Sequence, residues 1–269
     1  MTDAARSFIA RVKGQRAAWT KVGIVPFSAL DPDGDGVPLV ETTVIQIEAD
    51  LRHVYDGRVF GWDQSPKSPV IFGDPDATGD PDWAFARLPG AAREATTIAA
   101  QLGVEAVLGR DATRGRLLDL AGDADFIHVA AHGISSTEQP LEGSFLALAD
   151  GRLTAREIQD LQLNAFPLVI LSACQTGLGG PLDAGIIGLA RAFILAGASS
   201  TMSTLWDVDD AITAQIMVDF VGKLATMSPP EALRSAQAEA RRVHAHPRYW
   251  SGFMLFGSRT ITLPPAEAD

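Results

Sequence analysis

Short apolar runs that alternate with amphipathic segments from residue 69 onward most constrain how this chain can fold. The runs are typical of buried strands, and the segments between them carry apolar residues at helical spacing. Strands that alternate with helices form a mainly parallel sheet covered on both faces. The runs "FIHVAA" (126–131) and "LVILSA" (168–173) are almost entirely apolar, as in central strands. We therefore predict an α/β fold of three layers with about six central strands.

The predicted elements follow from this pattern and from helix capping residues. Strands are expected at 69–73, 104–109, 125–133, 144–150, 166–173, 200–206 and 250–257. Helices are expected at 91–103, 113–122, 154–161, 183–198, 209–225 and 229–245. Gly103 is predicted to end the first of these helices and Thr154 to cap the third.

The first 65 residues are less regular. We predict a helix at 3–18 and strands at 21–27 and 40–47, a small N-terminal region packed on a core of residues 66–260. Residues 261–269 are predicted to be a tail. The polar stretch "WDQSPKSP" (62–69) is a candidate linker, so the alternative is two domains divided near residue 65.

Composition excludes several classes of function. The formal net charge of −11 argues against nucleic acid and anionic membranes as partners. A single cysteine excludes an internal disulfide and Cys-rich metal or iron–sulfur sites. Neither a signal peptide nor an apolar run long enough to span a membrane is recognisable. We predict a cytoplasmic protein.

Two of the predicted strands end in residues with reactive side chains. His132 and Gly133 close the run that starts at 125, and Cys174 follows the run 166–173. In open α/β sheets, ligands bind beyond the carboxyl ends of the strands. If the two strands are neighbours, the imidazole and the thiol share one edge, as a thiol nucleophile and its acid–base partner require. The alternative is that Cys174 is a buried small residue and His132 a loop histidine.

Several stretches in sequence order resemble one family. "FIHVAAHG", "LVILSACQTG", "GLARAFILAGASSTMSTLWDVDD" and "HPRYWSGFMLFG" are similar to the CHAT family of caspase-like cysteine peptidases, related to caspases, separases and gingipains. "GIVPFSAL" and "LPGAAREATTIAAQLG" extend the resemblance over nearly the whole chain. The cysteine lies 174 − 132 = 42 residues after the histidine, against about 50 in caspases.

The resemblance implies a caspase-like sandwich and assigns roles. Cys174 would attack a peptide carbonyl and His132 would protonate the leaving amine. The backbone N–H groups of Gly133 and Cys174 would bind the oxyanion. No cofactor and no metal are implied.

The resemblance also suggests a preference for basic P1 residues. Separases place an acidic residue after the cysteine for this purpose, and "TLWDVDD" (204–210) supplies Asp210, Asp209 and Asp207. The spacing 210 − 174 = 36 favours Asp210, then Asp209. The alternative is that these carboxylates only cap the following helix.

The other motifs give weaker evidence of a function. "DPDGDG" (31–36) imitates a calcium loop, but Thr42 stands at its twelfth position, where glutamate is required. "GLGGPL" (177–182) lacks the third glycine of a dinucleotide loop. His244 and His246 are two apart and are interpreted as capping residues, and His128 as a core histidine.

The sequence predicts a cysteine endopeptidase that acts on a protein. The alternatives are a peptidase-like interaction or regulatory module without cleavage and a small-molecule thiol hydrolase or acyltransferase. Family members often carry tetratricopeptide arrays and act as effectors in bacterial regulation or conflict systems. This resemblance implies a protein activator or sensor, in trans or on a longer parent chain. We expect low basal activity, with mobile loops at 134–143 and 175–182.

Overall fold

A computed structural model describes residues 26–47, 59–62, 66–136, 138–172, 184–206, 208–257 and 259–262. For 59–62, 184–187 and 259–262 only the backbone is described. The predicted helix 3–18 and the loop 175–182 lie outside these residues.

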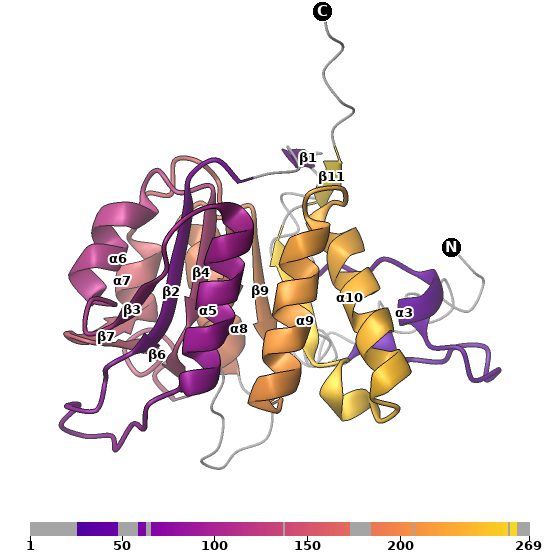
Figure 1. Cartoon of the computed structure of the whole chain (residues 1–269), viewed down its shortest axis with the longest axis horizontal. Coiled ribbons are helices and arrows are strands. Elements are labelled where there is room, and N and C mark those ends of the chain that lie inside the picture. Colours follow the sequence, from indigo (N-terminus) through magenta and orange to yellow (C-terminus); the bar gives the residue numbers. More distant parts are fainter. Residues whose placement is uncertain are drawn as a thin grey trace, which may run out of the picture.

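A six-stranded sheet forms the centre of the molecule, with the strand order β10-β9-β8-β4-β2-β3 (Figure 1). All neighbouring strands are parallel except β10, which runs antiparallel to β9. The strands are β2 (Pro69–Pro75), β3 (Val107–Gly109), β4 (Phe126–Ala130), β8 (Leu168–Leu171), β9 (Ser200–Thr204) and β10 (Phe253–Gly257). The prediction of a mainly parallel six-stranded sheet is confirmed.

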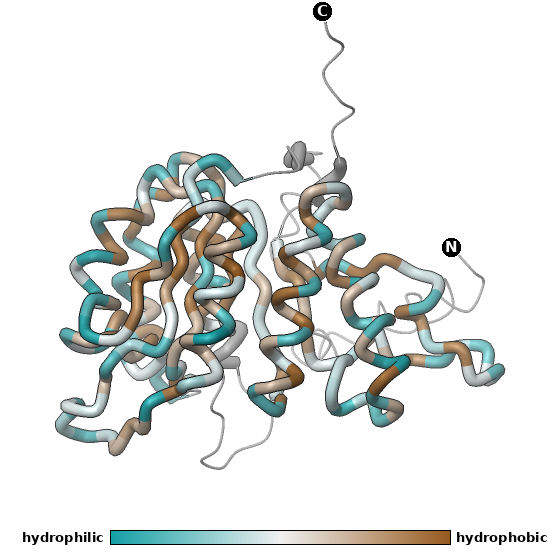
Figure 2. The backbone as a smooth tube through the Cα atoms, viewed as in Figure 1, coloured by the Kyte–Doolittle hydropathy of each residue, from teal (hydrophilic) through white to brown (hydrophobic). Residues whose placement is uncertain are grey.

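Helices cover both faces of this sheet. One face packs against α5 (Pro89–Leu102), α9 (Asp210–Lys223) and α10 (Pro229–Val243). The other packs against α6 (Arg114–Ala121), α7 (Ala155–Gln159) and α8 (Ala184–Leu195). Along β4 the side chains alternate between the two layers: Phe126 joins the first core, and Ile127 and Val129 join the second. Figure 2 shows hydrophobic residues along β2 and β4, between helices that carry both hydrophobic and hydrophilic residues.

Close packing and capping fix the helices on the sheet. A Cβ atom at Gly73 would lie 2.4 Å from the Cβ of Ala95, so only glycine lets β2 approach α5 this closely. Gly103 ends α5 in the left-handed conformation with φ of 71°. Thr154 forms a capping box with Glu157 at the start of α7. Both predicted caps are confirmed.

The predicted strand 125–133 is wrong at its end, because the chain leaves the large sheet after Ala130. Residues beyond it form β5 (His132–Ile134), which pairs antiparallel with β6 (Phe145–Leu148); β6 in turn pairs with β7 (Gly151–Thr154). Because the residues on both sides of the break are buried, the apolar run continues and hides it.

The predicted strand 40–47 is also wrong. Residues Leu39–Thr42 form the short helix α3, and Phe27–Ala29 form a 3-10 turn. Val40 is buried in the core beside α10, and Glu41 pairs with Arg241 at 2.6 Å, so tertiary packing overrides the β propensity of the sequence.

Two segments from the first 65 residues pair with the C-terminal part of the chain. Ile47 bridges to Phe256, and β1 (Val59–Trp62) pairs with β11 (Arg259–Thr262), which includes the first two residues of the predicted tail. The division of the chain into 1–65, 66–260 and 261–269 stays a prediction. No helix of the described segments is long and apolar enough to cross a membrane.

Candidate functional site

The carboxyl ends of β2, β4 and β8 meet at one edge of the large sheet, because neighbouring parallel strands end on the same side. The backbone N–H of Ser172, just beyond β8, donates to the carbonyl of Val129 in β4 at 3.0 Å. The chain that leads to His132 and the chain that leads to Cys174 therefore leave the sheet side by side. Cys174 itself lies outside the described residues.

His132 is buried at this edge, with 3% of its surface exposed. Its Nε2 lies 2.7 Å from the carbonyl oxygen of Ala86. Because a carbonyl only accepts, Nε2 donates and carries a proton. Nδ1 is buried and has no hydrogen-bond partner within the described part of the chain. The ring of Phe85 stacks on the imidazole, with centroids 4.8 Å apart and planes inclined by 24°.

This arrangement leaves His132 one nitrogen for proton transfer. Nε2 is committed to Ala86, so Nδ1 is the nitrogen that can accept or deliver a proton. Gly133 follows in β5, opposite Leu146 of β6. The oxyanion role predicted for Gly133 stays a prediction.

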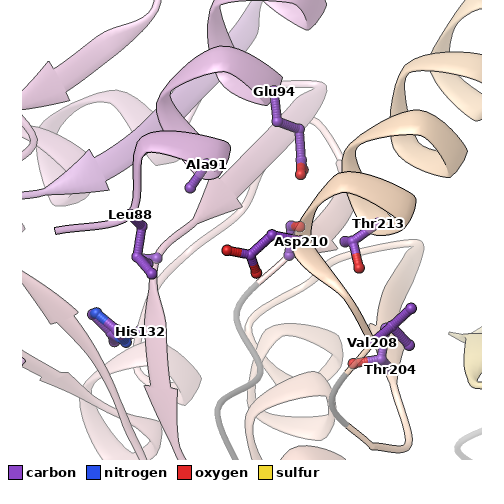
Figure 3. Close-up of a pocket in the computed structure, with 10 residues that line it drawn as sticks. Leu88, Ala91, Glu94, His132, Thr204, Val208, Asp210 and Thr213 are labelled. Atoms are coloured by element: carbon purple, nitrogen blue, oxygen red, sulfur yellow. The ribbon is translucent and has the colours of Figure 1, made fainter. Parts of the chain in front are cut away.

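A pocket opens beside His132 and contains about 540 Å³ of empty space, part of it open to solvent. Its lining residues come from α5, α9 and the strand ends, and are Leu88, Ala91, Glu94, Ala131, His132, Ser172, Thr204, Val208, Asp210 and Thr213. Figure 3 shows the Glu94 carboxylate directed toward Asp210, and the Asp210 carboxylate directed toward the side of Leu88 and His132.

The structure separates the predicted substrate-binding carboxylates. Asp209 is the N-cap of α9 and accepts the backbone N–H groups of Ala211 and Ile212 at 3.0 and 3.3 Å. Asp210 lines the pocket instead. A Cβ atom at Gly90 would lie 3.3 Å from the Cβ of Asp210. The first turn of α5 therefore packs closely against Asp210 at the position where it has no side chain. Asp207 lies outside the described residues.

Sequence reasoning missed Glu94 as a site residue. Its side chain is 3% exposed, and Oε1 lies 3.0 Å from Nε2 of His128, which is fully buried. His128 is thus a core histidine with a carboxylate partner. A signal existed: within α5, Glu94 is buried in helical phase with Ala95 and Ile98, where a charged residue is unusual.

The weaker motifs form local structure. Asp31 accepts the backbone N–H groups of Gly34 and Gly36, each at 2.8 Å, as in a polar turn. The Gly36 hydrogen bond is the main cause that lowers the pKa of Asp31. His246 accepts the N–H of Arg248 at 3.2 Å and caps a 3-10 turn. Within the segments described, no group of three or more His, Cys, Asp or Glu residues could hold a metal ion.

Solved structures with the same architecture are caspase-like cysteine peptidases. The separase of Saccharomyces cerevisiae in complex with securin gives a TM-score of 0.56 at 12% identity, over 90% of this chain and 15% of that chain. The Arg-specific cysteine proteinase gingipain R gives 0.52 at 11% identity, over 77% of this chain and 50% of that chain. At these identities the likeness shows the fold, and the predicted caspase-like fold is confirmed.

The family follows from the sequence match. The model of the CHAT domain covers residues 20–258, and the chain belongs to the CHAT domain family. Tetratricopeptide repeat protein 28 of Mus musculus is 27% identical over 65% of this chain, and that of Homo sapiens is 26% identical. The chain spans only 9% of the length of these relatives.

Proposed function

We propose that this chain is a cysteine endopeptidase that cleaves a protein substrate with Cys174 as nucleophile and His132 as acid and base. One observation carries the proposal. His132 is buried at the sheet edge with Nε2 held by Ala86, and it lines a pocket together with Ser172, two residues before Cys174. A histidine with one anchored and one unoccupied nitrogen is suited to proton transfer.

The proposed reaction regenerates both side chains. Nδ1 of His132 takes the thiol proton of Cys174, and the thiolate forms an S–C bond with the peptide carbonyl. The backbone N–H groups of Gly133 and Cys174 stabilise the resulting oxyanion. When the C–N bond breaks, His132 returns the proton to the leaving amine. Water then hydrolyses the thioester, with His132 taking its proton and returning it to the sulfur.

The lining of the pocket supports the proposal that the residue at P1 is basic. Asp210 offers a carboxylate in a partly enclosed space beside His132, and charge-assisted hydrogen bonds there would select Arg or Lys. The solved structure of gingipain R is described as that of an Arg-specific proteinase, which is consistent with this preference. We keep Asp209 and Asp207 only as secondary candidates for substrate binding, because Asp209 caps α9 and Asp207 lies outside the described residues.

Control by another protein is part of the proposal. The relatives are named as tetratricopeptide repeat proteins, and the separase structure is a complex with securin. We infer a protein activator or sensor, on a longer parent chain or in trans, and low activity of the isolated chain. A cytoplasmic location and a role as a bacterial effector belong to the same proposal.

The deciding experiment is labelling of Cys174 by an acyloxymethyl ketone in the wild type and in His132→Ala, with cleaved protein N-termini compared between wild type and Cys174→Ala. An endopeptidase gives His132-dependent labelling and Cys174-dependent new N-termini. Equal labelling of Cys174 in the wild type and in His132→Ala overturns the dyad and favours an interaction module. His132-dependent labelling without new N-termini, even after an activating lysate is added, favours a small-molecule thiol hydrolase or acyltransferase.

Specificity is tested with a positional-scanning peptide library and two neighbouring variants. Asp210→Ala is expected to lose the preference for Arg and Lys. Asp209→Ala is expected to keep it while losing about 1 kcal/mol of stability, because it removes a helix cap. A preference for Asp or small apolar P1 residues, or basic selectivity that survives in Asp210→Ala, contradicts the assignment.

A further inference from the structure

The contact that orients His132 comes from a segment without regular structure of its own. Residues 83–88 lie in neither a helix nor a strand. Within them, Phe85 stacks on the imidazole and Ala86 accepts the Nε2 proton. A carbonyl in an irregular segment stays in place only if other bonds hold that segment.

Asp74 supplies three such bonds. Its side chain is 6% exposed at the end of β2 and accepts the Arg87 guanidinium, from Nε at 3.1 Å and from Nη2 at 2.5 Å. It also accepts the backbone N–H of Leu88 at 2.6 Å. A fork of two bonds between guanidinium and carboxylate fixes direction as well as distance. The three donors belong to the two residues that immediately follow Ala86.

The backbone at Asp74 is adapted to this task. Its φ of 46° lies in the left-handed region, which Asp and Asn tolerate better than other residues with side chains. At this turn, at the end of β2, the Asp74 carboxylate is buried and bonded to Arg87 and Leu88 of the segment 83–88.

We propose that Asp74 is a positioning residue for His132: by binding Arg87 and the Leu88 N–H it fixes the Ala86 carbonyl that holds the imidazole. The chemical consequence rests on the proposed function, because it takes His132 as the acid–base partner of Cys174. The structural consequence, the fixing of Nε2–H, does not depend on catalysis.

The variants follow from the geometry. Asp74→Asn keeps a side chain that tolerates positive φ and an acceptor for Leu88, but it removes the charge that binds Arg87. Arg87→Gln removes the guanidinium from a side chain that is 49% exposed. Arg110→Gln is the matched control, because it removes a neighbouring ion pair, with Asp76 at 3.4 Å, and leaves both Asp74 and Arg87 in place.

The first measurement is solvent exchange of the His132 Nε2–H proton by NMR in the full chain, its signal identified by its loss in His132→Ala. We expect roughly tenfold or faster exchange in Asp74→Asn and Arg87→Gln, with amide exchange in β4 unchanged and Arg110→Gln like wild type. Wild-type exchange in both variants overturns the proposal, as does an equal acceleration of the β4 amides.

The second measurement is the rate of Cys174 alkylation by iodoacetamide. Displacing a partner group costs roughly tenfold to a hundredfold in rate, so both variants are expected to slow alkylation by at least tenfold. If His132→Ala leaves this rate unchanged, the dyad fails while the exchange experiment still decides the role of Asp74. If His132→Ala slows alkylation and Asp74→Asn does not, the positioning role fails and the dyad stands.

Discussion

The ion pair of Asp80 with Arg152 gives the most quantitative prediction. Nε of Arg152 donates to Asp80 at 2.7 Å, and a second bond from Nη2 completes the fork. Asp80 also accepts the backbone N–H groups of Asp82 and Trp83 at 2.9 and 3.0 Å. These bonds, that of Arg152 first, lower the pKa of Asp80 from 3.8 to about 2. At about 1.4 kcal/mol per pKa unit, Asp80→Asn is expected to lower the free energy of unfolding by about 2 kcal/mol at pH 7.

The pH dependence gives the sign of the effect. A carboxyl group with a lowered pKa in the folded state stabilises the protein fully above its unfolded pKa of 3.8, and this contribution is lost as the pH falls through the folded value of about 2. The difference between wild type and Asp80→Asn is therefore expected to be largest above pH 5 and to shrink steadily below pH 4. Urea denaturation at pH 7, 5 and 3 measures it.

Asp82→Asn is the matched control. Asp82 also contacts Arg152, at 2.8 Å, but its side chain is 68% exposed, and exposed ion pairs contribute about 0–1 kcal/mol. A difference between wild type and Asp80→Asn that stays constant from pH 7 to pH 3 would refute the reasoning. A loss in Asp82→Asn as large as that in Asp80→Asn would refute it as well.

Three further changes test the packing, each by urea denaturation. Gly73→Ala is expected to cost about 1–3 kcal/mol, because its Cβ would lie 2.4 Å from that of Ala95; Gly79→Ala, where nothing lies within 4 Å, is its neutral control. Thr154→Ala is expected to cost about 1 kcal/mol by removing the capping box of α7, and a neutral result would show that the box is dispensable. Glu94→Ala is expected to cost about 2 kcal/mol or more, since it removes the carboxylate that lies 3.0 Å from the buried Nε2 of His128. Glu94→Gln is expected to cost less, because it keeps an oxygen and the volume of the side chain; equal losses would contradict this.

The sequence predicts the large sheet well, because its strands are buried on both faces. In β8 all four residues are buried and all four are apolar, so the sequence itself indicates a central strand. The same property hides the break after Ala130, because β4 and His132 of β5 are both buried although they belong to different sheets. The sequence predicts a strand where α3 lies, because α3 has only one buried residue, Val40, and one residue cannot show a helical period.

The candidate site, too, can be predicted from the sequence only in part. The position of His132 at the sheet edge follows from the strand pattern, because every parallel strand delivers its end to that edge. Its partner Ala86 leaves no trace in the sequence, since the accepting group is a backbone carbonyl that any residue would supply. The different roles of Asp209 and Asp210 depend on the exact first residue of α9, and helix boundaries are the least certain part of a pattern.

A series of stacked side chains connects the small three-stranded sheet, β5-β6-β7, to the candidate site. The Arg152 guanidinium lies 4.7 Å from the ring centre of Phe145, which meets Trp83 edge-on at 6.3 Å. Trp83 stacks on Phe85 at 5.9 Å, and Phe85 stacks on His132. This continuous series runs from β7 to the imidazole, and the ion pair of Arg152 holds its far end as Asp74 holds the near end. Because close-packed interiors transmit displacement, we expect the geometry of His132 to depend on this small sheet as well as on β4, the strand that leads to it.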